Sequence, residues 1–176
     1  MTSTTVTRTL RLDPELNSSI AASAEREGVS PSHIVNQALR RTVEWDAFAQ
    51  KFGFVSVPAS LMNRLMDNLS EEQARELGRW VGKNHVREFL TFWFKEVSPR
   101  NVVQGYPRLT AKYGRAFEYE ERADGGRWVI ILKHGSGRKW SAYYEELLRA
   151  VFSDIVQRQA AIESSEHQVV ARFSLA

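Results

Sequence analysis

The first constraint on this chain is a short stretch near its start in which side chains alternate in character. From residue 5 to residue 12 the order is Thr-Val-Thr-Arg-Thr-Leu-Arg-Leu. A period of two is typical of a β-strand with one half-buried face. An isolated strand of this length is not stable in water, and no second strand pattern follows nearby. The stretch therefore predicts a strand that pairs with the same strand of a second chain.

Two helical patterns follow the alternating stretch. The first begins at Asp13, a favourable N-cap, with Pro14 in the first helical position. It ends at Gly28, a residue that readily adopts positive φ. The second begins at Ser30 and is expected to continue to about residue 50. The first helix can place an apolar stripe against the paired strands, and this stripe consists of Leu16, Ile20 and Ala24.

This order of one strand and two helices resembles the ribbon-helix-helix family of Arc/MetJ-type DNA-binding proteins. The similarity covers about residues 5–47, and its most specific part is the inter-helix turn Gly-Val-Ser-Pro-Ser at residues 28–32. The resemblance implies a homodimer whose two strands form an antiparallel ribbon in the major groove of double-stranded DNA. The positions that match the base-reading side chains of the family are Thr7, Thr9 and Arg11.

The resemblance also implies a phosphate contact at the start of the second helix, at Ser30, Ser32 and His33. The first amides of a helix are free and carry partial positive charge, so they attract anions. The alternative is that Ser30 only caps the helix and that His33 faces solvent.

Charge is distributed unevenly between the two parts of the chain. The net charge is +3. Residues 1–50 contain five basic and six acidic side chains, a net charge of −1, which leaves +4 for the remainder. Phosphate neutralisation dominates the affinity of most DNA-binding proteins, so this balance counts modestly against DNA binding. Arg8 and Arg11 nevertheless lie on the predicted strand, and most of the acidic residues lie on the helices.

Composition is typical of a globular protein, with 43% hydrophobic and 26% charged residues. The absence of cysteine excludes disulfides and thiolate metal sites and fits a reducing compartment. No signal-peptide pattern and no membrane-spanning stretch is present, so we expect a cytoplasmic protein without a membrane partner.

Residues 51–176 predict a second domain of the α+β class, a small and mostly antiparallel sheet covered by helices. Ser70 and Gln73 form a capping-box pattern that opens a long helix. The sequence Ala-Asp-Gly-Gly at residues 123–126 is a hairpin signal. The expected elements are a turn and short strand at 52–58, helices at 59–69, 70–97 and 140–159, a broken helix at 98–113, and strands at 115–121, 127–134 and 168–175.

Two features of this second domain indicate how it packs. Gly78 and Gly82, four residues apart, would let another element approach the long helix closely. The dense aromatic residues either fill a core or line a pocket for an apolar ligand.

One stretch of the second domain is a candidate anion site. Glycines and basic residues stand between a predicted strand and the helix that follows, so Ser136, Arg138 and Lys139 are the candidate ligand contacts. A sharp turn with a solvated basic pair is the alternative. We predict no catalytic residues, no metal site and no cofactor, because the four histidines are scattered and no nucleophile stands beside a base in the sequence.

Together these features predict a homodimeric transcriptional regulator that binds specific DNA through residues 1–50. Residues 51–176 would sense a small-molecule effector or drive further assembly of dimers into tetramers, in the manner of repressors that join a ribbon to a sensor domain. One alternative is an antitoxin that represses its own operon, although antitoxin tails are usually disordered. The other is an interaction module that uses the ribbon only to dimerise.

Overall fold

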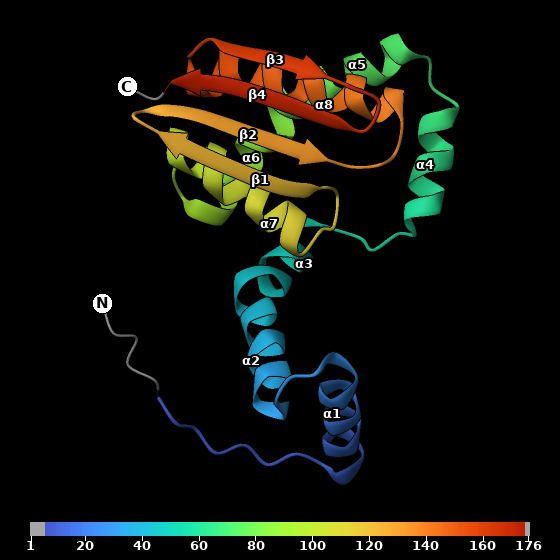
Figure 1. The fold of residues 1–176 in the computed structure, drawn as a ribbon, viewed down its shortest axis with the longest axis vertical. Coiled ribbons are helices and arrows are strands. Elements are labelled where there is room, and N and C mark those ends of the chain that lie inside the picture. The colour runs from blue at the N-terminus through green and yellow to red at the C-terminus, as the bar shows by residue number, and fades with distance from the viewer. Residues whose placement is uncertain (1–5, 175–176) are drawn as a thin grey trace. The chain divides into compact units, whose positions relative to one another are not determined.

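The computed structural model describes residues 6–174. The chain divides into two compact units, Met1–Ala47 and Phe48–Ala176. The sequence had placed this division between residues 50 and 51. Figure 1 shows the elements of both units, coloured in chain order.

The predicted N-terminal strand is not formed in the single chain. Thr5 lies outside the described residues, and residues 6–13 have no regular secondary structure before helix α1 begins at Pro14. The expectation of a β-α-α arrangement is therefore wrong for one chain alone, whose N-terminal unit is helical from Pro14 onwards. The physical reason is that a strand needs a hydrogen-bonding partner, and the described part of this chain offers none to the segment.

The two predicted helices of the N-terminal unit are confirmed. Helix α1 spans Pro14–Glu27, and the Asp13 carboxylate accepts a hydrogen bond from the Leu16 amide at 2.7 Å. Gly28 ends α1 in the left-handed conformation, with φ of 65°. Helix α2 spans Pro31–Arg41 with Ser30 as its N-cap. A π-helical turn, Thr42–Asp46, and helix α3, Ala47–Phe52, continue the helical segment close to the predicted end.

The C-terminal unit combines helices with a four-stranded antiparallel sheet. The capping box is present at the start of α5, where the Ser70 amide donates to the Gln73 side chain at 2.7 Å. The helical elements are α4 (Ala59–Asp67), α5 (Glu71–Trp80), a π-helical turn (Val81–His85), α6 (Val86–Phe94), a second π-helical turn (Asn101–Gly105), α7 (Tyr106–Lys112), α8 (Arg138–Val151) and a third π-helical turn (Phe152–Val156).

The strands lie in the order β1-β2-β4-β3. Strands β1 (Glu118–Asp124) and β2 (Arg127–Lys133) form the predicted hairpin, and Gly125 and Gly126 in its turn both have positive φ. Strand β4 (Gln168–Ser174) is also confirmed and pairs with β2.

Two local predictions in the C-terminal unit are wrong. Strand β3 (Ala160–Ser164) lies where the sequence predicts only a polar connection after the helix at 140–159. Its alanines are poor strand formers, and only pairing with β4 at the sheet edge makes it a strand. The expected short strand before Pro58 is absent, because residues 54–58 pair with no strand of the described sheet.

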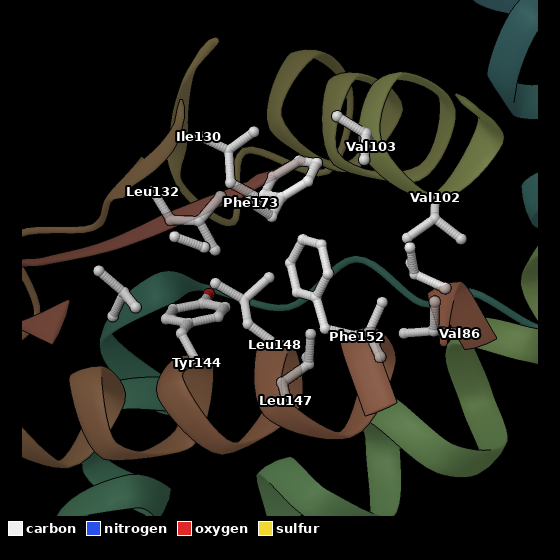
Figure 2. Close-up of a cluster of buried hydrophobic side chains, with 14 of the residues drawn as sticks. Val86, Val102, Val103, Ile130, Leu132, Tyr144, Leu147, Leu148, Phe152 and Phe173 are labelled. Carbon is white, nitrogen blue, oxygen red and sulfur yellow. The ribbon is translucent and has the colours of Figure 1, made fainter. Parts of the chain in front are cut away.

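Helices cover one face of the sheet (Figure 1), and the core of this unit lies on that face. Figure 2 shows Ile130, Leu132 and Phe173 of the sheet pointing towards Leu148 and Phe152 of the α8 segment. The ring of Phe152 lies 4.5 Å from that of Phe173, centroid to centroid. Valines from the helical segments complete the cluster, namely Val86, Val102, Val103 and Val151. The sheet and α8 are therefore two layers around one core.

The aromatic end of α6 contributes to the interior of this unit. Phe89, Leu90 and Trp93 are all buried, and the rings of Phe89 and Trp93 stack at 4.3 Å. The Phe48 ring stacks on Trp93 at 5.3 Å, which ties the first residues of this unit to α6. The aromatic residues of this region thus pack together as core.

Two glycines allow α5 and α8 to cross at close range, as predicted. A methyl group at Gly78 would lie 2.1 Å from the Tyr143 carbonyl oxygen, and one at Gly82 would lie 2.6 Å from that of Leu147. No Cβ atom tolerates such contacts, so the helix backbones themselves are in contact here.

We predict that Gly78→Ala destabilises the protein by about 1–3 kcal/mol, because the added methyl group must push α5 away from α8. Urea unfolding measures the change. Glu76→Ala, at an exposed position of the same helix, is the control and should change the free energy of unfolding by less than about 0.5 kcal/mol. Equal effects of the two substitutions would contradict the close crossing.

Candidate functional site

The three predicted base-reading residues lie in the segment that precedes α1. Thr7, Thr9 and Arg11 are exposed, as is every residue from 6 to 13. The apolar residues that alternate with them are also in solvent: Val6 is 74% exposed, Leu10 53% and Leu12 39%. The apolar side chains of this segment are therefore in contact with water, and its backbone has no strand partner among the described residues.

The three predicted phosphate-contacting residues lie together at the start of α2. The Ser30 hydroxyl accepts a hydrogen bond from the His33 amide at 3.2 Å and so caps the helix. The His33 ring is exposed and lies within 2.6 Å of the Gln37 side chain. Within the described residues the Ser32 amide has no acceptor, which leaves one N–H at this helix start open to an anion.

The candidate anion site of the C-terminal unit lies at the turn between β2 and α8. Each of its three side chains has a partner within the protein. The Ser136 hydroxyl donates to the His134 carbonyl oxygen at 3.0 Å, and the Lys139 ammonium group donates to the Asp67 carbonyl oxygen at 2.8 Å. The Arg138 guanidinium lies 3.9 Å from the Glu71 carboxylate. These contacts join the turn to the α4–α5 region.

A histidine and a serine that the sequence did not connect meet beside this turn. His134 Nε2 lies 3.0 Å from the hydroxyl of Ser141, which is fully buried. His134 Nδ1 accepts a hydrogen bond from the Ser136 amide, so the ring proton is on Nε2 and is donated to Ser141. The Ser141 hydroxyl in turn donates to the Glu166 carbonyl oxygen at 3.1 Å. This direction of donation is the reverse of the one that activates a serine nucleophile.

No family model and no curated protein matches this chain.

The interior of the C-terminal unit holds little space for a ligand. An enclosed cavity of about 20 Å³ lies among apolar side chains that include Tyr106, Phe117 and Tyr144. Pockets for small molecules are usually about 300–1,000 Å³, so these aromatic side chains act as core rather than as a ligand pocket. Over the part of the chain that the structure describes, no cluster of three metal-ligating side chains is present, and no helix is long and apolar enough to cross a membrane.

The structure also has a groove that the sequence did not predict, and three separate segments form it. Arg115 before β1, Lys133 at the end of β2 and His167 before β4 line the same depression. About fifty residues separate the first from the last, so no local pattern in the sequence could have grouped them.

We predict that stability depends on the protonation of His134. Burial, with a smaller contribution from nearby His167, lowers the pKa of His134 to about 4 from its ordinary 6.5. The folded state therefore favours the neutral ring. The contribution of the neutral His134 ring to the free energy of unfolding is complete above pH 6.5. It is lost as the pH falls from 6.5 towards 4. After allowance for solvent screening at this half-buried group, the loss should be about 1–2 kcal/mol.

Urea unfolding between pH 7 and pH 4 tests this dependence. In His134→Gln the part of the pH dependence due to this ring should disappear, because glutamine does not titrate. Asn36→Gln, a change between two non-titrating residues at an exposed position, is the control and should leave the profile unchanged. Identical profiles for wild type and His134→Gln would refute the assignment.

Proposed function

We propose that this chain is a DNA-binding transcriptional regulator that acts as a homodimer through its N-terminal unit. The observation that carries the proposal is the lack of a core in that unit. Among the described residues before Phe48, only Ala24 and Trp45 are buried. The large apolar side chains of the unit that remain exposed are Val6, Leu10, Leu12, Leu16, Leu39 and Val43.

A second copy of the same unit is the binding partner that best accounts for these exposed side chains, because association would bury them. Burying a valine or leucine side chain completely contributes about 1.5–3 kcal/mol. Total stabilities are only about 5–15 kcal/mol, so six such side chains in each chain are a strong drive to associate. Pairing of residues 6–12 with the same segment of a partner would satisfy the backbone as an antiparallel ribbon and place Leu10 and Leu12 against the helices.

In such a ribbon the other face carries Thr7, Thr9 and Arg11. A two-stranded ribbon fits the major groove, and an arginine can contact guanine through two hydrogen bonds. The open Ser32 amide and the adjacent His33 at the start of α2 would then lie where a helix N-terminus binds a DNA phosphate. These two features supply base reading and backbone positioning from one small unit.

The C-terminal unit supports a regulator better than an antitoxin. It has its own buried core and a complete sheet, whereas antitoxin tails fold only on binding a toxin. It also keeps an apolar surface on α4, where Leu61 is 47% and Leu65 is 54% exposed. We propose that this surface pairs with a second copy of the chain and adds to the assembly formed by the N-terminal unit.

We predict that the protein is a dimer at micromolar concentration in sedimentation equilibrium. Leu10→Asn should raise the dissociation constant about a hundredfold, because each dimer loses two buried leucines at about 1.5 kcal/mol each. Thr9→Asn, at the neighbouring position on the opposite face, should leave it unchanged. A folded wild-type monomer at this concentration would overturn the proposal.

We predict that Arg11→Ala weakens binding to a preferred sequence by about 1–3 kcal/mol and relaxes the preference at one base pair. The sequence is first selected from random duplexes, and fluorescence anisotropy then compares it with a scrambled duplex. Arg8→Ala, on the ribbon face that carries the leucines, should keep the ratio of the two affinities. Equal losses on both duplexes in Arg11→Ala would mean that Arg11 contacts only phosphate.

A further inference from the structure

A groove of about 640 Å³ lies at one end of the sheet in the C-terminal unit. Glu118, Lys133 and Gln168 occupy matching positions on β1, β2 and β4, so the strand ends and their flanking loops meet at this point. The volume lies within the range of small-molecule sites. The groove shares Phe117 with the small cavity in the core, and its other lining residues are different.

The groove combines a free cation with an apolar wall. Within the described residues the Arg115 side chain has no ion pair or hydrogen bond, whereas Lys133 is paired with Glu120. Phe117 and Ala111 provide apolar surface beside Arg115. Glu118 is the acidic side chain of the lining, and it limits the positive charge of the groove. A ligand with a single negative charge fits this balance better than one with two.

Arg115 has an unusual backbone conformation. Its φ is 52°, in the left-handed region where glycine is favoured. The other non-glycine residues with positive φ in the described chain are Lys95 and Gln157, and each is the C-cap of a helical segment. Arg115 instead lies two residues beyond Tyr113, the C-cap of α7. Backbone conformations of this kind in non-glycine residues cluster at active sites and ligand clamps.

We propose that this groove binds a small monocarboxylate with an apolar body. The Arg115 guanidinium pairs with the carboxylate through two parallel hydrogen bonds. The apolar body lies against Phe117 and Ala111. His167, which also lines the groove, can add a ring N–H donor. The site is built within the C-terminal unit, so it does not depend on DNA binding.

Isothermal titration calorimetry of the full chain tests the site, with benzoate as the probe and inorganic phosphate as the comparison. Wild type should bind benzoate with a millimolar dissociation constant and bind phosphate more weakly. Arg115→Gly should weaken benzoate binding about tenfold or more, because a charge-assisted pair is lost. Its melting temperature should not fall, since glycine adopts positive φ freely.

Two further variants test whether the loss of benzoate binding is specific to the Arg115 side chain. Arg115→Asn, another residue that tolerates the left-handed region, should lose binding as Arg115→Gly does. Arg122→Ala removes an exposed arginine of β1 and should bind benzoate as wild type does. The proposal is overturned if wild type does not bind benzoate, or if the Arg115 variants bind it with unchanged affinity. Phosphate binding as tight as benzoate binding would overturn the carboxylate class.

Discussion

The packing of α8 holds the C-terminal unit together. One side of this helix meets the sheet through Leu148 and Tyr144. Another side meets α5 at Gly78 and the π-helical turn after α5 at Gly82. A helix that contacts a layer on each side cannot shift towards one without losing contact with the other. The turn before α8 is fixed as well, because Ser141 joins His134 to the Glu166 carbonyl oxygen. The walls of the groove beside Arg115 are therefore held by the same helix that organises the core.

The N-terminal unit differs from the C-terminal unit because it lacks a core of its own. It has fewer than fifty residues, and a unit of that size buries little apolar surface by itself. Its helices are well capped, at Asp13 and Ser30, so local structure forms without a core. These helices nevertheless leave the side chains of Leu10, Leu39 and Val43 exposed to solvent. The proposed dimer rests on this difference, because the unit has well-formed helices but no interior of its own.

Sequence reasoning succeeded where the signal was local. The N-caps, the left-handed Gly28, the capping box at Ser70 and the glycine turn after β1 each depend on a few adjacent residues. It failed for β3 and for the expected strand before Pro58, because a strand exists only through its neighbours. The start of α2 was brought together as expected, since its residues are consecutive. The groove was missed for the opposite reason: Arg115 and His167 are joined only by the fold.

The strand order has a consequence for how the molecule is made. Strand β4 is the last of the four in the chain, yet it lies in the middle of the sheet, between β2 and β3. During synthesis the β1–β2 hairpin and α8 are made before β4, and β3 has no partner until β4 follows. Val169, Ala171 and Phe173, which are buried in the finished core, arrive after the apolar side chains they cover. Completion of this unit is thus a late, cooperative event, with apolar surface open to chaperones until the last strand is inserted.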